Sequence, residues 1–151
     1  MSRLNSFREL EYLRENIKKQ QKKFTTSVMV CGGTGCRALQ SQQLIEAVKS
    51  EISKQKLDKV VRLYVTGCHG FCEQGPVMII EPGNTFYCQV APEDAFEIVS
   101  QTFLYGKVIE RLLYTDPVSG KKIQKQSDIP FYRAQDRLLL SQNLKIDPCS
   151  V

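Results

Sequence analysis

The sequence predicts an α/β protein whose centre is a four-stranded mixed sheet with flanking helices. Short apolar runs rich in β-branched residues recur along the chain, and apolar residues three or four positions apart indicate helices between and after them. At 151 residues, of which 42% are hydrophobic, the chain is long enough to bury a single core. The predicted strands lie at residues 27–31, 59–65, 77–81 and 85–90.

The first predicted element is an amphipathic helix within residues 1–24. Its apolar residues recur every three or four positions, which places them on one face of a helix. We expect this face to dock against or cover another surface. The residues that form it are Leu4, Phe7, Leu10, Leu13 and Ile17.

A strand, a helix and a second strand follow. The sequence SVMVC at residues 27–31 runs into a glycine-rich turn, and KVVRLYV occupies residues 59–65. Between these strands, the spacing of apolar residues predicts a helix over residues 38–52. Its inner face is expected to carry Leu39, Leu44, Ile45, Val48 and Ile52.

The last two strands form a predicted hairpin. Pro82, Gly83 and Asn84 separate VMIIE from TFYCQV, and these residue types favour a tight turn. Pro92 then opens a helix that Gly106 ends. The order β-α-β followed by β-β-α is typical of the thioredoxin-like arrangement, in which a crossover helix joins the first two strands.

The chain therefore divides into three parts. The amphipathic helix occupies residues 1–24 and the thioredoxin-like domain residues 25–106. Residues 107–151 contain turn signals and only broken apolar runs, so we interpret them as a connector. Because a connector leads toward something, we expect the chain to be a piece of a longer polypeptide.

Charge is distributed unevenly over these parts. Residues 1–24 hold 7 Lys and Arg against 3 Asp and Glu, residues 25–106 hold 6 against 8, and residues 107–151 hold 8 against 5. A nucleic-acid-binding protein would concentrate basic residues on its folded domain, so we expect no nucleic-acid partner. The basic flanks are expected to be solvated helix faces or surfaces that meet other subunits, a second copy in a homodimer among them.

The sequence also indicates a compartment. No apolar run approaches the roughly 20 residues of a membrane span, and the first residues lack the basic start and apolar core of a secretory signal. We therefore expect a cytoplasmic protein without direct membrane insertion. In a reducing compartment, clustered cysteines bind metal or do redox chemistry more often than they form disulfides.

Four of the six cysteines form two close pairs. Cys31 and Cys36 are separated by four residues, Cys68 and Cys72 by three, and 31 residues lie between the pairs. Each pair follows a predicted strand, and the two strands are neighbours in the expected sheet, so the pairs should meet at one edge. An iron–sulfur cluster needs soft thiolate donors gathered in this way. The pattern predicts one [2Fe-2S] cluster held by all four sulfurs.

The residues around these cysteines suit such a cluster. Glycine lets the backbone come close and adopt positive φ, so that N–H groups turn toward the sulfurs and stabilise the reduced cluster. The helix opened by the first loop would add positive potential there. Thr34 and Thr66 are expected to offer hydroxyl donors, and Phe71 to shield the cluster from water. The glycines concerned are Gly32, Gly33, Gly35, Gly67 and Gly70.

Other kinds of site compete with this interpretation. Four cysteines also satisfy a structural zinc site, although zinc-binding pairs are usually two residues apart. Thiol-disulfide exchange would need a Cys-x-x-Cys motif, and a nucleotide site would need a fuller glycine pattern and a lysine. His69 alone cannot build a Rieske centre, which takes two histidines. It is expected beside the ligands or at the surface.

The two remaining cysteines are not expected to bind metal. Cys88 alternates with Phe86 and Val90 in a predicted strand, so we interpret it as a buried thiol. Cys149 lies in the connector beside a proline and is interpreted as incidental.

The cysteine loops resemble those of a known family. CGGTGC at residues 31–36 and TGCHGFCEQGP at residues 66–76 are similar to the motifs of the thioredoxin-like [2Fe-2S] ferredoxins. This family includes the small cluster-bearing subunit of respiratory complex I. A similar domain opens the flavin-binding subunit of NAD-linked, often electron-bifurcating hydrogenases and formate dehydrogenases. The resemblance covers about residues 25–106 and implies that all four cysteines are ligands.

The tail carries a second resemblance. LLYTDPVSGKKI and DIPFYRAQDRLLL are similar to the stretch that joins this domain to the flavin and NADH module in the hydrogenase-type subunit. The resemblance implies a one-electron relay in a multisubunit NAD(P)H-linked oxidoreductase, with a flavin/NADH-binding module and other iron–sulfur subunits as partners. That module is not in this sequence, so NADH oxidation is not assigned to the chain. The alternative function is a structural or redox-sensing module whose cluster or zinc holds the loops together.

Overall fold

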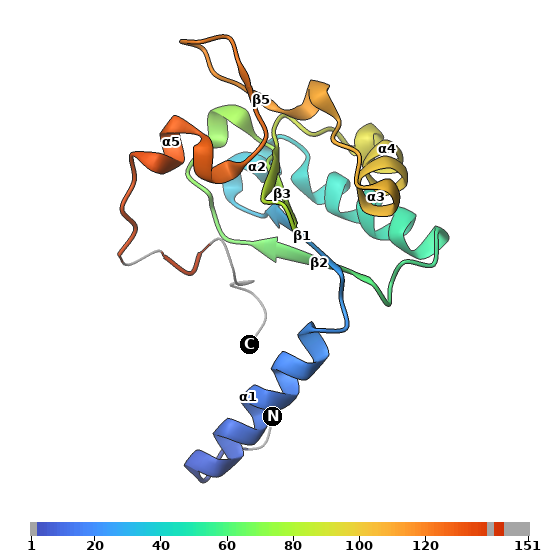
Figure 1. Cartoon of the computed structure of the whole chain (residues 1–151), viewed down its shortest axis with the longest axis vertical. Coiled ribbons are helices and arrows are strands. Elements are labelled where there is room, and N and C mark those ends of the chain that lie inside the picture. Colours follow the sequence, from blue (N-terminus) through green and yellow to red (C-terminus); the bar gives the residue numbers. More distant parts are fainter. Residues whose placement is uncertain (1–2, 139–140, 144–151) are drawn as a thin grey trace.

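The predicted four-stranded mixed sheet forms the centre of the protein. Figure 1 shows the computed structural model, which describes residues 3–138 and 141–143. The strand order is β2-β1-β3-β4. β1 and β2 are parallel, whereas β3 is antiparallel to both β1 and β4. The strands are β1 (Thr26–Cys31), β2 (Val61–Thr66), β3 (Met78–Glu81) and β4 (Thr85–Tyr87).

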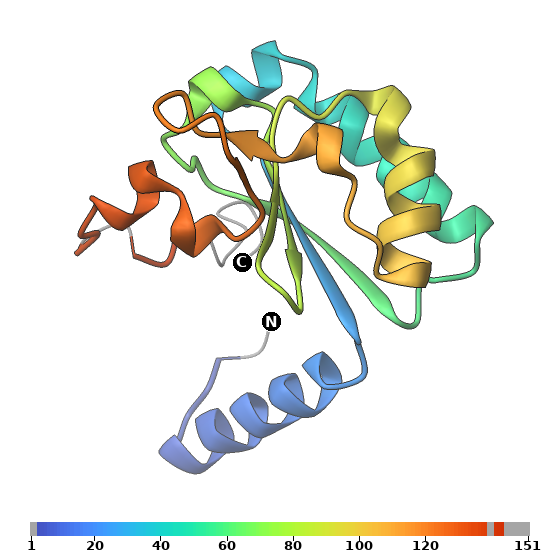
Figure 2. The ribbon, with the colours of Figure 1, turned by 45° about the horizontal axis from the view of Figure 1, so that its top comes forward.

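Different parts of the chain cover the two faces of this sheet. α3 (Ser41–Lys54) and α4 (Ala95–Glu97) lie together on one face (Figure 2). They pack on alternate side chains of β1, among them Val28. Met29 and Cys31 belong to the second core, on the opposite face. The first cysteine of the predicted cluster therefore lies on the face of the sheet opposite α3 and α4.

The helical segment after β1 differs from the prediction. A short helix, α2 (Thr34–Ala38), comes first, and α3 begins only at Ser41. Gln40 between them has a φ of 66°, a left-handed conformation that interrupts the helix. Leu39 is consequently 48% exposed and does not join the inner face. The sequence predicts that the first cysteine loop opens the long helix. In the structure that loop opens the short α2 instead, and the long helix begins at Ser41. The buried inner face of α3 comprises Ser41, Leu44, Ile45, Val48 and Ile52.

The predicted amino-terminal helix forms, but it covers no other element among the described residues. α1 (Phe7–Gln21) begins after Ser6, whose hydroxyl accepts a hydrogen bond from the backbone of Glu9 at 3.2 Å. None of its residues is buried, and Leu10 is 50% exposed. Both views show α1 extending away from the sheet (Figures 1 and 2). Its apolar face packs on no part of the chain that the structure describes.

The β3–β4 hairpin turns as predicted, at Gly83, whose φ is 116°. The alternation expected beyond it holds only in part. Cys88 is buried in the same core as Phe86, but Val90 joins the core on the α3 side. Gln89 has a φ of 52°, which turns the chain and breaks the two-residue period. The prediction of a buried Cys88 thiol is confirmed, and the expected shared side for Val90 is wrong.

The next segment is a helical stretch that packs against α3. It consists of a 3₁₀ turn, α4 and a π-helical turn, and it ends at Gly106, where φ is 65°. The end at this glycine agrees with the sequence prediction. The two flanking turns are η2 (Pro92–Asp94) and η3 (Ile98–Phe103).

The segment after residue 106, predicted as a connector, folds back onto the domain as far as it is described. Ile109, Leu113 and Ile129 are buried. Isolated bridges tie Tyr87 of β4 to Leu113 and Thr85 to Lys125. Cys149 lies outside the described residues. The segment contains η4 (Glu110–Leu112), β5 (Tyr114–Thr115), β6 (Lys122–Ile123), η5 (Gln126–Asp128) and α5 (Pro130–Arg133).

No helix within residues 3–138 and 141–143 is both long enough and apolar enough to cross a lipid bilayer.

Tyr87 links the sheet to the returning segment. Its ring is fully buried, and its hydroxyl accepts the N–H of Ile109 at 2.9 Å and pairs with the Thr102 hydroxyl at 2.9 Å. We expect Tyr87→Phe to lower the free energy of unfolding by about 1–3 kcal/mol, because the Ile109 N–H is left buried without an acceptor. Urea denaturation followed by circular dichroism measures this loss. Tyr105→Phe, at a ring that is 74% exposed, is the matched control and should change little. Equal effects of the two variants would contradict the prediction.

Candidate metal centre

The parallel register of β1 and β2 brings the two cysteine loops together. Cys31 is the last residue of β1, and its partner in the ladder is Thr66, the last residue of β2. Cys36 follows within α2, Cys68 lies two residues beyond β2, and Cys72 begins the 3₁₀ turn η1 (Cys72–Gln74). Because parallel strands end at the same edge, both pairs lie at one edge of the sheet.

Glycines let the two loops touch. A side chain at Gly35 would place its Cβ only 2.9 Å from the sulfur of Cys72, and one at Gly33 would lie 3.3 Å from the sulfur of Cys68. The backbone of the first loop is therefore packed directly against the sulfurs of the second. This close approach, which any larger residue would prevent, gathers the thiols into one site.

Positive φ plays a smaller part than the sequence predicts. Of the five loop glycines, only Gly70 adopts it, with a φ of 77°. The Gly70 N–H donates to the Cys68 sulfur at 3.3 Å, as expected of such a turn. Gly32 serves close packing instead, because a Cβ there would lie 2.6 Å from the side chain of Val65. Gly67 likewise leaves room, in its case for the side chain of Asn143.

The buried sulfur pair has strongly shifted acidity. The neighbouring Cys36 thiol lowers the pKa of Cys31 to about 6, with help from the backbone N–H groups of His69 and Gly33 and against the effect of burial. The pKa of Cys36 is raised, mainly by its hydrogen bond with Cys31 and by burial. Since iron binds thiolates, the lowered pKa of Cys31 favours metal binding.

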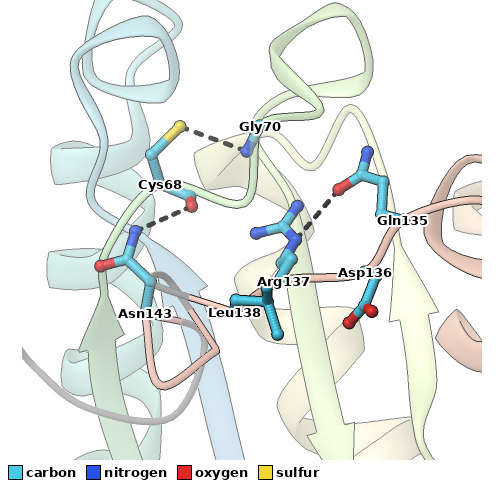
Figure 3. A pocket seen from close by; sticks show the side chains of 7 residues that line it. All are labelled: Cys68, Gly70, Gln135, Asp136, Arg137, Leu138 and Asn143. Atoms are coloured by element: carbon cyan, nitrogen blue, oxygen red, sulfur yellow. Dashed lines mark hydrogen bonds between the residues drawn. The ribbon is translucent and has the colours of Figure 1, made fainter.

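The four cysteines differ in exposure. Cys31 and Cys36 are 1% and 2% exposed, whereas Cys68 and Cys72 are open to solvent. Figure 3 shows Cys68 at the edge of a pocket of about 600 Å³ that lies between its loop and Arg137. A group bound by all four sulfurs would have one protected side and one side that another molecule can approach.

The hydroxyl donors expected at the sulfurs are not placed there. The Thr66 hydroxyl lies 2.9 Å from Nε2 of His69 and donates to the carbonyl oxygen of Val30 in β1 at 3.4 Å, so its partners are not the sulfurs. Thr34 is exposed at the start of α2. Backbone N–H groups are thus the donors that the structure offers to sulfur, Gly70 first among them.

His69 is buried and not at the surface. Its ring is 1% exposed, and burial, with a contribution from the charge of Arg137, lowers its pKa to about 4. The imidazole is therefore neutral at pH 7. Its Nδ1 atom has no hydrogen-bond partner among the described residues.

Phe71, predicted as a shield, is the centre of an aromatic cluster. It is 8% exposed and stacks on Phe131 with ring centroids 4.2 Å apart and planes 6° apart. The Tyr132 ring meets it edge-on with centroids 5.8 Å apart, and the Tyr114 ring lies tilted by 53° at 5.5 Å. Three of its partners come from the carboxyl-terminal segment, so that segment helps to exclude water from the ligand loop.

Sequence reasoning missed this contribution of the carboxyl-terminal segment. Arg137 donates to the carbonyl oxygen of His69. The side-chain amide of Asn143 donates to the carbonyl oxygen of Cys68 at 3.1 Å (Figure 3). Arg137 lies in DIPFYRAQDRLLL, which is similar to a tail segment of the hydrogenase-type subunit, but nothing in that stretch placed it at the second cysteine loop. Asn143 lies outside the stretch. The aromatic pair Phe131–Tyr132 beside a proline was the only local signal of a packed segment.

The donor set fits a [2Fe-2S] cluster. All four cysteines are free thiols. Among the described residues, no group of three or more His, Cys, Asp or Glu is arranged around a single metal ion. A [2Fe-2S] cluster does not need such a group, because each iron takes two protein ligands and shares bridging sulfides. The exposed pair, the buried pair and the N–H donors between them match that demand.

Comparisons with known proteins point in the same direction. Residues 16–102 match the family described as thioredoxin-like [2Fe-2S] ferredoxin. A 2Fe-2S ferredoxin of Clostridium pasteurianum is 32% identical over 77 residues, which are 51% of this chain and 76% of that protein. A putative 2Fe-2S ferredoxin of Priestia megaterium is 28% identical over 67% of this chain and 80% of its own length. The crystal structure of the wild-type thioredoxin-like [2Fe-2S] ferredoxin of Aquifex aeolicus superposes with a TM-score of 0.56 at 29% identity, covering 62% of this chain and 99% of that one.

Proposed function

The chain belongs to the thioredoxin-like [2Fe-2S] ferredoxin family, and from this premise we propose that it serves as a one-electron relay inside a multisubunit NAD(P)H-linked oxidoreductase. The ferredoxin electron carrier and its [2Fe-2S] cluster follow from the family. When bound, the cluster takes up and releases one electron. The sulfurs of Cys31, Cys36, Cys68 and Cys72 hold it, and the surrounding chain positions it and limits water.

The observation that carries the relay is the asymmetry of the ligands. Cys31 and Cys36 hold the protected side, while Cys68 and Cys72 form an edge open to solvent. A redox centre on a partner can approach that edge closely, which a sealed cluster would not allow. This edge suits exchange with a flavin or with another iron–sulfur centre.

The larger assembly is proposed from the tail. Its similarity to the segment that precedes a flavin and NADH module supports a flavin/NADH-binding module and further iron–sulfur subunits as partners. The described part of that tail contacts the second cysteine loop through Phe131 and Arg137. We place the assembly in the cytoplasm, where thiols stay reduced.

The test is isolation of the native assembly. The chromosomal gene is tagged, the chain is purified without oxygen, and flavin, iron and bound subunits are measured. We expect flavin and additional iron–sulfur centres to copurify, and NADH or NADPH to reduce the [2Fe-2S] centre, seen as a spin-half signal in electron paramagnetic resonance. The chain purified alone, carrying a cluster that dithionite reduces and neither nucleotide does, would refute the assembly.

A redox titration separates the relay from the alternative function in sensing. A relay must pass repeatedly through both oxidation states, so its absorbance should return fully over several cycles of reduction and reoxidation. Loss of iron on the first reduction would instead identify a redox-sensing module. This measurement needs no partner, so it also stands if the proposed assembly is wrong.

A further inference from the structure

The ligand loop, which carries the exposed Cys68 and Cys72, is held in place by residues that lie outside the matched family domain. We call the residues that hold it, 129–138 and 141–143, the strap. The family match ends at residue 102, so the strap is an addition to the matched domain. It meets the loop at three positions: Asn143 at Cys68, Arg137 at His69, and Phe131 at Phe71, as the contacts described above show.

Arg137 is the charged residue of the strap that hydrogen-bonds to the loop. Its guanidinium donates to the carbonyl oxygen of His69, and its Nε donates to the side-chain oxygen of Gln135 at 3.0 Å. Its guanidinium carbon lies 6.0 Å from the centre of the Tyr132 ring. A Cβ on Gly70 would lie 3.4 Å from the same guanidinium. The cation is thus fixed directly beside the residue whose N–H donates to the Cys68 sulfur.

The negative charge in this pocket, on Asp136, points away from the cysteine loop. Asp136 also lines the pocket, but Figure 3 shows its carboxylate directed away from Cys68, while the guanidinium of Arg137 lies toward Gly70. Gln135 and the His69 carbonyl, both neutral, are the hydrogen-bond partners of Arg137. The ligand loop therefore faces a positive charge that these contacts do not neutralise.

We propose that Arg137 is a positioning residue that fixes the exposed ligand loop and makes the cluster easier to reduce. Reduction adds one negative charge to the site, and a fixed cation nearby stabilises the reduced form more than the oxidised form. The hydrogen bond to the His69 carbonyl holds that charge in place, and it orients the loop whose backbone N–H faces sulfur. The inference rests on the cluster alone and needs no larger assembly.

The experiment measures the midpoint potential of the purified chain by redox titration in the absence of any partner. Arg137→Gln should shift the potential to a more negative value, and Arg137→Lys, which keeps the charge, should have a potential close to that of the wild type. Arg133→Gln is the matched control. It removes the same charge, and Arg133 lies exposed in the same segment, four residues away. It should leave the potential nearly unchanged. Raising the salt concentration should shrink the difference between wild type and Arg137→Gln.

A charge-neutral variant separates electrostatics from mechanical support. Asn143→Ala removes the hydrogen bond to the Cys68 carbonyl without altering charge. It should speed the loss of iron to a chelator while leaving the potential close to wild type. The proposal is overturned if Arg137→Gln keeps the wild-type potential, or if either Arg133→Gln or Arg137→Lys shifts it as far as Arg137→Gln does. Should Arg137→Gln not retain a cluster, the Arg137→Lys potential and its salt dependence decide the question.

Discussion

Cys36→Ala should yield a colourless chain that binds little or no iron. Cys36 is one of the two buried cysteines proposed as ligands, and its sulfur lies against Cys31 and Gly75. The wild type should bind about two irons per chain, held by four thiolates. Iron analysis, visible absorption and the spin-half signal after dithionite reduction measure the loss. A Cys36→Ala protein with wild-type iron content would show that another residue is the fourth ligand.

Cys88→Ala is the matched control for this experiment. Cys88 belongs to the same apolar core as Cys31 and Cys36, so it is the thiol best placed to substitute for a ligand. Burial, however, raises its pKa to about 11, so that it stays protonated at neutral pH. We expect Cys88→Ala to keep the colour and full iron content. Loss of iron in this variant would contradict the assignment of ligands.

Gly35→Ala should weaken cluster binding without weakening the fold. The added Cβ would lie 2.9 Å from the sulfur of Cys72, closer than packed atoms allow, so the two cysteine loops must move apart. Overpacking of this kind costs about 1–3 kcal/mol, which is roughly a 5- to 150-fold loss of affinity. Gly35 lies inside α2, where alanine is the better helix former, so the backbone itself gains. The rate of iron loss to a chelator should rise while the melting temperature of the iron-free chain does not fall.

Gly106→Ala provides the opposite combination. Gly106 has a φ of 65° but no atom within 4 Å of an added Cβ. Alanine there should cost about 1 kcal/mol of stability through backbone strain, with unchanged iron retention. If both glycine variants lose iron at the same rate, general destabilisation and not loop contact explains the effect, and the steric account of Gly35 is wrong.

Local patterns were sufficient for much of this protein. The alternation and β-branched content of the four runs predicted the strands, and the structure changes their ends by only a few residues. The paired cysteines after two neighbouring strands predicted a [2Fe-2S] cofactor, which the family confirms. Both signals are short-range, because strand period and ligand spacing are set by residues close together in the chain.

At two places a single backbone angle made the prediction from residue periodicity wrong. Gln40 and Gln89 both adopt positive φ, although neither residue type favours it. At Gln40 the turn separates α2 from α3, so Leu39 falls outside the inner face. At Gln89 it sends Val90 to the other side of the sheet. Neither turn carries a glycine, asparagine or proline from which it could have been predicted.

The sequence by itself determined the element order, the sheet and the cofactor, since each is written in the spacing of nearby residues. Only the tertiary structure decided that two cysteines are buried and two exposed, that α1 covers nothing in the described chain, and that the tail returns to the second loop. Arg137 and His69 are 68 residues apart in the chain. Their contact depends on how the hairpin, the helices and the aromatic cluster turn the chain between them, and no local pattern encodes the sum of those turns.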